Sequence, residues 1–307
     1  MNIQEIIKKE RPTIKDSSLK AYSISLRKLN NNNEIKNFNF LKNEKEIFKI
    51  INNLALSTKR AYLTSILVIL GAIKNKEFDN VLKIYREQLA KLNNEYNEFI
   101  SKNEKTDKQD KNWVSLKALN KVRNQYKKEL EERAILKKKT PLTRPQLELL
   151  QKYIVASLYT LAAPVRLDYG NMKIIDREKD NDGKRNFLLV KGRNKKSFIF
   201  NDFKNKKSMG EREIKINTKL NTILNIWLTH NKTGNFLLNS KGEIMNENAL
   251  SKYIKKVFKP TGKDITLNLL RHIYISSHID LEAMKKQKQL ADSMLHSGEQ
   301  QIDYAKK

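Results

Sequence analysis

Hydrophobic positions recur with the period of an α-helix in three separate stretches near the start of the chain. Ser17 or Ser18 stands at the start of the first stretch and Ser57 at the start of the third, and serine favours helix starts. Residues 13–73 therefore predict a compact helical unit within a first domain over residues 1–80. The periodic positions are Leu19, Tyr22, Leu26 and Leu29, then Ile47, Ile50 and Ile51, then Tyr62, Ile66, Ile69 and Leu70.

The segment that follows is longer and more highly charged. Its pattern predicts one or two long helices within residues 79–139, separated by the polar stretch SKNEKTDKQDKN. Trp113 follows this stretch and is expected to anchor the next helix in a core. A run of lysines over residues 137–139 fits a solvated linker and a contact with a nucleic-acid backbone equally well. We expect residues 81–139 to form a charged helical extension or linker.

The second half changes from helical to strand-like spacing and back. Thr143 caps a helix with Pro145 in its first turn, and a second apolar helix is expected around residues 153–161. The short runs NFLLVK, SFIFNDFK and REIKIN predict a three-stranded antiparallel sheet, and helical patterns follow it. The predicted fold is mainly α with this small sheet, and the third domain is expected over residues 140–307.

The charge balance adds a class of partner. Lys and Arg number 62 against 34 Asp and Glu, which gives a net charge of +28 at pH 7 and a pI near 9.9. A charge of this size indicates nucleic acid, because Lys and Arg contacts with phosphates release condensed counterions. The alternative explanation is that an AT-rich genome has enriched the chain in lysine. That enrichment does not explain the excess of Lys over acidic residues.

Several classes of protein are disfavoured. The chain has no cysteine, which excludes disulfides, thiolate metal sites and a cysteine nucleophile. No apolar run approaches ~18 residues, so no membrane span is expected. The first residues are charged and contain no apolar signal segment, which fits an intracellular protein.

Each candidate catalytic residue is weak evidence by itself, and only the set taken together indicates a site. Arg271 lies among apolar residues, where an unpaired charge is costly, and a phosphate is a suitable partner because guanidinium can bind it with two parallel hydrogen bonds. Arg166 ends an apolar helix, and Lys204 lies at a turn after a strand. His296 and Tyr304 follow near the C-terminus, where Tyr304 is otherwise a packing residue and His296 a surface residue.

In this order, the motifs APVRLDY, FNDFKNKKSMGEREIKI, NLLRH, MLHSG and IDYAK resemble those of the tyrosine recombinase (phage-type integrase) family. The stretches SSLKAYSISLRKL and LSTKRAYLTSILVIL look like that family's helical core-binding (SAM-like) domain, which holds the other side of the duplex. The charged segment NEKTDKQDKNWVSLKAL looks like an extension in integrases of large DNA viruses, virophages or related mobile elements. The resemblance covers roughly residues 13–73 and 140–307.

The resemblance implies a role for each catalytic candidate. Tyr304 would attack a phosphodiester and form a 3′-phosphotyrosyl intermediate, which a 5′ hydroxyl then resolves. Arg166 and Arg271 would bind the non-bridging oxygens, and His296 would add a hydrogen bond. Lys204 would protonate the leaving 5′ oxygen, with Lys206 and Lys207 as alternatives in the same turn. The covalent link conserves the bond energy, so no cofactor and no metal is expected.

The resemblance also implies partners. Double-stranded DNA would be bound by a C-shaped clamp, and a homo-tetramer would act on two DNA sites. Lys59, Arg60, Lys206 and Lys207 are the expected DNA contacts. The expected location is the host nucleus or a viral factory for a viral element, and otherwise the cytoplasm or nucleoid.

Two positions depart from the family's pattern. Its His-x-x-Arg is Asn268-x-x-Arg271 here, and asparagine can donate a hydrogen bond but cannot shuttle a proton. Its acid three residues after the first arginine is replaced by Asp168, two residues after Arg166. His272 directly follows Arg271, but adjacent helix positions face different ways, so it is not assumed to substitute.

Two other functions therefore stay open. One is a type IB topoisomerase-like enzyme that acts as a monomer with the same chemistry. The other is a DNA-binding derivative of the fold that has lost catalysis, which Asn268 suggests. A covalent protein–DNA adduct that requires Tyr304 separates both enzymes from the binding protein.

Overall fold

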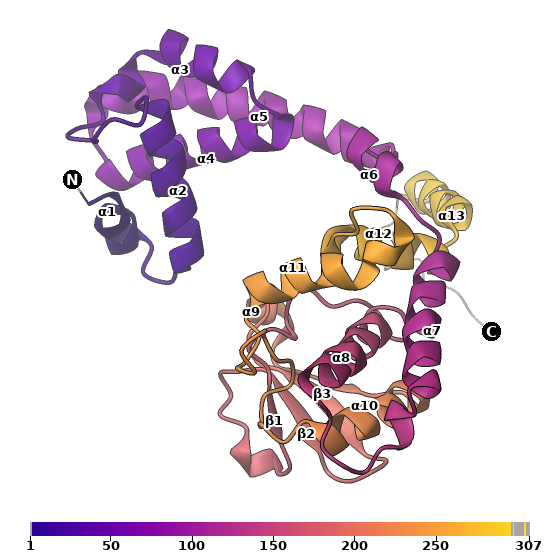
Figure 1. Cartoon of the computed structure of the whole chain (residues 1–307). Coiled ribbons are helices and arrows are strands. Elements are labelled where there is room, and N and C mark those ends of the chain that lie inside the picture. Colours follow the sequence, from indigo (N-terminus) through magenta and orange to yellow (C-terminus); the bar gives the residue numbers. More distant parts are fainter. Residues whose placement is uncertain (1, 296, 298–303, 305–307) are drawn as a thin grey trace. The chain divides into compact units, whose positions relative to one another are not determined.

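The computed structural model describes residues 2–295, 297 and 304. The chain divides into two compact units, Met1–Lys105 and Thr106–Lys307 (Figure 1). Mostly helical structure with a small sheet confirms the predicted fold class at that level.

The first unit is helical, and its long helix α4 (Leu56–Ile73) packs against α1 (Ile3–Glu10), α2 (Asp16–Leu29), α3 (Glu44–Asn52) and α5 (Asp79–Ser101). The three helices predicted within residues 13–73 are α2, α3 and α4. The short 3₁₀ helices among the described residues are η1 (Asn39–Lys42), η2 (Lys76–Phe78), η3 (Ile135–Lys137), η4 (Glu178–Asp180) and η5 (Lys259–Thr261).

By length and composition alone, helix α4 could span a membrane, with a mean hydropathy of 1.3 over its 18 residues. Core helices of soluble proteins can have the same length and composition. Leu63, Ile66 and Ile69 of α4 are fully buried among the other helices of the unit. We therefore interpret α4 as the core helix of this unit.

The expected extension over residues 81–139 is not a separate unit. Helix α5 belongs to the first unit, where it buries Val81, Tyr85 and Leu92, and the Tyr85 hydroxyl donates to the Leu41 carbonyl at 2.8 Å. Helices α6 (Asp107–Asn112) and α7 (Leu116–Glu132) belong to the second unit. The chain therefore divides between residues 105 and 106 instead of at residues 80 and 139. The sequence pattern did not indicate this, because the many charged residues of α5 and α7 concealed a buried stripe on each helix.

The second unit is built around α8 (Arg144–Leu158), with α7 along one side of it and α11 (Glu247–Phe258) along another (Figure 1). Helix α10 (Thr218–His230) also packs against α8. The chain then continues through α12 (Leu267–His278) and α13 (Leu281–Ser293). Thr143 and Gln146 form a capping box at the start of α8, which confirms the predicted helix start.

The sheet corrects the sequence prediction. It has four strands in the order β1 (Lys173–Ile175), β2 (Phe187–Val190), β3 (Lys196–Phe200) and β4 (Arg212–Lys215). The three predicted runs form the antiparallel part, but β1 pairs with β2 in parallel, so the sheet is mixed. Strand β1 has only three residues, which is too short for an alternating pattern to identify it.

Candidate active site

Arg166 lies in the loop between α8 and β1, and buried aromatic residues hold this loop in place. The Tyr159 hydroxyl donates to the Arg166 carbonyl at 3.2 Å, and the rings of Tyr159 and Tyr169 meet edge to face at 5.8 Å. The Gly170 N–H donates to the Leu167 carbonyl at 2.7 Å. Both tyrosines are buried, which fixes the backbone on either side of Arg166.

Gly170 brings the same loop against the start of α11. A Cβ at this position would lie 2.8 Å from the backbone nitrogen of Glu247, closer than real Cβ atoms approach. A residue larger than glycine would therefore push the loop and the helix apart. The loop is thus tied to α11 as well as to α8.

Arg271 reaches this loop from α12. Leu267, Leu269, Leu270 and Ile273 bury one side of the helix, and Thr266 caps its start by accepting the Leu269 N–H at 3.3 Å. This orientation leaves Arg271 half-buried. Asn268 and His272 are exposed and one turn apart, on the same side of the helix.

Arg166, Asp168 and Arg271 form one electrostatic cluster. Burial raises the pKa of Asp168, while the nearby Arg166 and Arg271 act in the opposite direction. Burial and the nearby Arg166 lower the pKa of Arg271, and Asp168 partly offsets this. The cluster thus contains two half-buried arginines and only one carboxyl group. Two guanidinium groups held close together in this way are suited to bind an anion such as a phosphate.

Lys204 lies in the connection between β3 and β4, as the sequence predicted, and its side chain is exposed. The short helix α9 (Lys206–Met209) follows directly. Lys206 donates to the Gly183 carbonyl at 3.2 Å, which ties α9 to the turn before β2, and Lys207 is exposed. Phe203 packs against the core beside Lys204 and so anchors the connection.

The β2–β3 hairpin carries further lysines that the sequence interpretation passed over. The Lys191 N–H closes this turn on the Lys195 carbonyl at 3.0 Å, and the Lys191 side chain pairs with Glu178, which raises its pKa. Lys196 is 5% exposed and donates to the Arg193 carbonyl and to the Asn221 amide. The stretch KGRNKK between two apolar runs was the available signal for a lysine-bearing hairpin.

The remaining catalytic candidates are near the C-terminus. Tyr304 is helical and its side chain is 69% exposed. A phenol that attacks DNA must be accessible, and this exposure satisfies that condition. His296 lies outside the described residues.

The expected DNA contacts in the first unit differ from each other. Both Lys59 and Arg60 lie in the first turns of α4 and are half-buried. The Arg60 guanidinium lies 3.9 Å from the centre of the Tyr96 ring, and its Nε donates to Asn93 at 2.7 Å. Arg60 therefore also joins α4 to α5.

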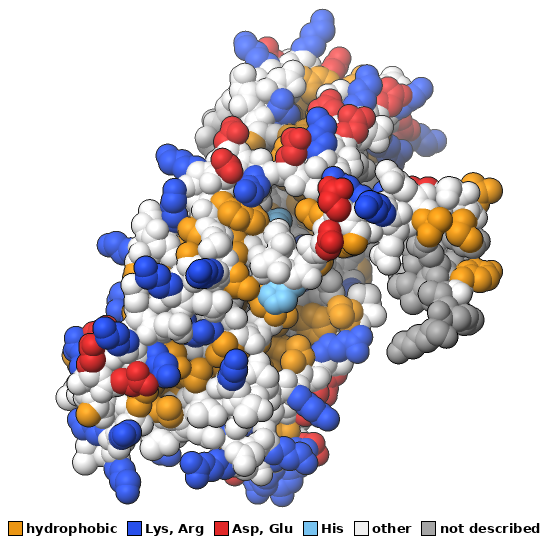
Figure 2. All heavy atoms as spheres, turned by 90° about the vertical axis from the view of Figure 1, so that its right-hand side faces the viewer, with side chains coloured by type: hydrophobic (Ala, Val, Ile, Leu, Met, Phe, Trp, Pro, Cys, Tyr) orange, Lys and Arg blue, Asp and Glu red, His pale blue; other side chains and the backbone are white. Residues whose placement is uncertain are grey.

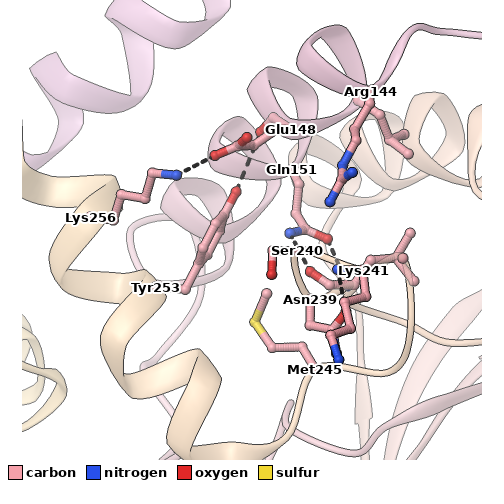
Figure 3. Close-up of a pocket in the computed structure, with 12 residues that line it drawn as sticks. Arg144, Glu148, Gln151, Asn239, Ser240, Lys241, Met245, Tyr253 and Lys256 are labelled. Carbon is pink, nitrogen blue, oxygen red and sulfur yellow. Dashed lines mark hydrogen bonds and ion pairs between the residues drawn. The ribbon is translucent and has the colours of Figure 1, made fainter.

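In the part of the chain that the structure describes, the face in Figure 2 and the cavity in Figure 3 do not indicate another candidate active site. Figure 2 shows one face on which Lys and Arg side chains are scattered among hydrophobic ones instead of gathered in a single patch. Among the described residues, no three His, Asp or Glu side chains are grouped so that they could hold a metal ion. A cavity of about 300 Å³ lies between α8, α11 and the segment around Ser240, and it contains none of the candidate catalytic residues (Figure 3).

The cavity in Figure 3 has a mixed lining. Leu147, Leu238 and Met245 form its apolar part. Lys256 pairs with Glu148 at 2.5 Å, and the Tyr253 hydroxyl donates to the Glu148 carbonyl at 3.3 Å. Its polar groups thus mainly join α8 to α11.

Comparisons with known proteins give no family assignment. The sequence matches no protein-family model and no curated protein.

Proposed function

We propose that the protein cuts and rejoins duplex DNA through a covalent bond between Tyr304 and a 3′ phosphate, as a site-specific recombinase or integrase of a viral or mobile element. The observation that carries the proposal is the convergence of Arg166 and Arg271, which are distant in the sequence, on one half-buried cluster. The net charge of +28 supports a polyanionic substrate.

The chemistry of the first step follows from these residue types. The Tyr304 oxygen attacks phosphorus, a phosphorus–tyrosyl bond forms, and the bond from phosphorus to the 5′ oxygen breaks. Arg166 and Arg271 stabilise the charge that develops on the two non-bridging oxygens, and the same cations favour the phenolate of the nucleophile. A 5′ hydroxyl reverses the step on the same or another strand, so neither water nor a high-energy cofactor is consumed.

The leaving 5′ oxygen needs a proton, and two lysine-bearing connections can supply it. Lys204 is the donor implied by the motif order, with Lys206 and Lys207 beside it. The β2–β3 hairpin offers Lys191 and Lys195 instead. A substrate with sulfur in place of the leaving oxygen separates them, because a thiolate leaves without protonation. The lysine whose alanine variant loses cleavage of the normal substrate but not of the sulfur substrate is the donor.

A second candidate function is a DNA-binding derivative that no longer cleaves. Asn268 favours it, because an amide at this exposed position cannot transfer a proton. His272 lies one turn further on the same side of α12, and its imidazole supplies the donor and acceptor nitrogens that acid–base catalysis uses, which supports an active enzyme instead.

The experiment that tests the proposal uses a duplex with a nick close to the cleavage site. Cleavage then releases a short fragment with a 5′ hydroxyl, which diffuses away and cannot reverse the step. We expect the wild-type protein to accumulate as a covalent adduct with the 3′ end of the cleaved strand. Binding without an adduct on any such duplex would support the binding protein.

For an active enzyme, the products then decide between two outcomes. Exchange of strands between two copies of one site supports a recombinase that assembles as a tetramer on two duplexes. Relaxation of any supercoiled circle by a monomer supports the topoisomerase-like alternative.

A further inference from the structure

The buried side chain of Asn186 connects two loops of the candidate active site. Asn186 stands directly before β2 and is 7% exposed. Its Nδ2 donates to the carbonyl oxygens of Asp168 at 3.0 Å and Asp202 at 2.9 Å. Its Oδ1 accepts from the backbone N–H groups of Asn201 at 2.9 Å and Asp202 at 2.8 Å. One amide therefore holds the loop of Arg166 and the start of the connection that carries Lys204.

The four hydrogen bonds use the full donor and acceptor capacity of this side-chain amide. An amide has two donor hydrogens, which both go to carbonyl oxygens, and its oxygen accepts two N–H groups. Only one orientation of the amide satisfies all four partners, so the exchange of its oxygen and nitrogen is excluded. An apolar side chain here would leave buried backbone groups unpaired, which folded proteins avoid.

The backbone of Asn186 adds a fifth bond. Its carbonyl accepts the Lys173 N–H at 3.2 Å, which joins the start of β1 to the start of β2. Asn201 in turn donates its own amide to the Arg185 carbonyl at 2.7 Å. Asn186 is thus held by the sheet, and its side chain fixes the loop of Arg166 and the irregular start of the β3–β4 connection to that sheet.

We propose that Asn186 is a positioning residue, which fixes the spacing between Arg166 and the connection that begins at Asn201 and contains Lys204. The inference rests on the proposed function, because the spacing matters where an arginine and a proton donor act on one phosphodiester. The arginine must face a non-bridging oxygen, and the proton donor must face the leaving 5′ oxygen of the same phosphorus. Groups held in place beforehand stabilise a transition state without a cost of reorganisation during the reaction.

Asn231 provides a matched control in the same unit. It is 3% exposed, and its Nδ2 donates to the carbonyl oxygens of Asn235 at 2.7 Å and Phe236 at 3.4 Å. Its Oδ1 accepts from the N–H of Thr233 at 3.2 Å and from its hydroxyl at 2.8 Å. Asn231 therefore makes the same number of side-chain bonds as Asn186, but within a loop that contains no candidate catalytic residue.

The test compares Asn186→Ala with Asn231→Ala in the full chain. We expect both variants to lower the melting temperature. Only Asn186→Ala should lower the single-turnover rate of adduct formation, by about 100-fold, with DNA affinity unchanged. A sulfur leaving group should restore part of that rate, because it removes the need for a well-placed proton donor. Wild-type cleavage by Asn186→Ala, or an equal loss in Asn231→Ala, overturns the proposal.

Two further arms keep the test decisive. If Asn186→Ala does not fold, Asn186→Asp replaces it, because aspartate keeps the accepted bonds and loses the donated ones, and the same loss of rate is expected. If the wild-type protein forms no adduct, the proposed function fails, and hydrogen exchange then tests the connection itself. Faster exchange at the Gly170 amide in the Asn186 variant, but not in Asn231→Ala, supports the connection, and unchanged exchange overturns it.

Discussion

At the scale of single residues, Asp168 is a member of the cluster whose ionisation is opposed by burial. Burial raises the pKa of its carboxyl despite the opposing effect of Arg166 and Arg271. The folded state therefore binds the proton more tightly than the unfolded state does. Ionisation of Asp168 costs folding free energy as the pH rises from about 3.8 through the folded-state pKa, and the full cost is present above that window.

The first prediction follows from this sign. Asp168→Asn removes the ionisation cost, so its melting temperature relative to the wild type should be higher at pH 7 than at pH 3.5. Differential scanning calorimetry at both pH values checks this, because the other carboxyl groups are common to the two proteins. A difference in melting temperature that is independent of pH, or that grows at low pH, would contradict the assigned cause.

Asn268 gives a second prediction at the same scale. If the protein is an active enzyme, Asn268→Ala should reduce single-turnover cleavage, because a hydrogen bond to the phosphate is lost. Asn268→His should cleave at least as fast as the wild type, since a positioned imidazole adds acid–base catalysis worth about 10²–10⁴-fold in favourable cases. Equal rates for all three proteins would mean that this position does not touch the phosphate.

At the scale of elements, periodicity predicted much of the fold, and motif order singled out candidate residues, of which Arg166 and Arg271 share one electrostatic cluster. The three helices within residues 13–73 and the runs that became β2, β3 and β4 were correctly located. Strand β1 was missed because pairing along its edge, and not its own three residues, makes it a strand. The role of α5 was missed because its charged majority masked the few buried positions that attach it to α4.

In the candidate site, too, some residues can be recognised from the local sequence and others only from the folded structure. Arg166, Lys204 and Arg271 could be singled out from local motifs. Asn186 could not, because its partners Asp168, Asn201 and Asp202 become neighbours only after the sheet forms. The interaction of Arg166 and Arg271 with one carboxylate likewise depends on the packing of α12 beside the loop after α8.

The third prediction tests the corrected boundary. A fragment of residues 1–105 should fold cooperatively, whereas residues 1–80 alone should not, because loss of α5 uncovers the side of α4 that it packs against. Circular dichroism during urea unfolding compares the two fragments. A cooperative transition of the shorter fragment with the same midpoint would show that α5 does not belong to this core.

At the scale of the whole molecule, the positive charge predicts DNA binding that weakens steeply with salt. Lys59→Ala should lower affinity and reduce the slope of log affinity against log salt by about one, if Lys59 contacts a phosphate. Lys42→Ala is the matched control, because Lys42 already pairs with Glu77 at 2.7 Å. Fluorescence anisotropy over a salt series measures both slopes. An equal change in the two variants would remove Lys59 from the interface.

The proposed reaction attaches Tyr304 covalently to DNA. The most direct measurement incubates wild type, Tyr304→Phe and Tyr274→Phe with a nicked duplex from the ends of the proposed element, whose cleaved strand is labelled at its 5′ end, and separates the products under denaturing conditions. Tyr274 is the control because it lies on α12, where its ring stacks on His278 at 4.1 Å. We expect an adduct with wild type and Tyr274→Phe, none with Tyr304→Phe, and a DNA-linked peptide that contains Tyr304. An adduct that persists in Tyr304→Phe, or no adduct with the wild type despite DNA binding, would contradict the proposed reaction.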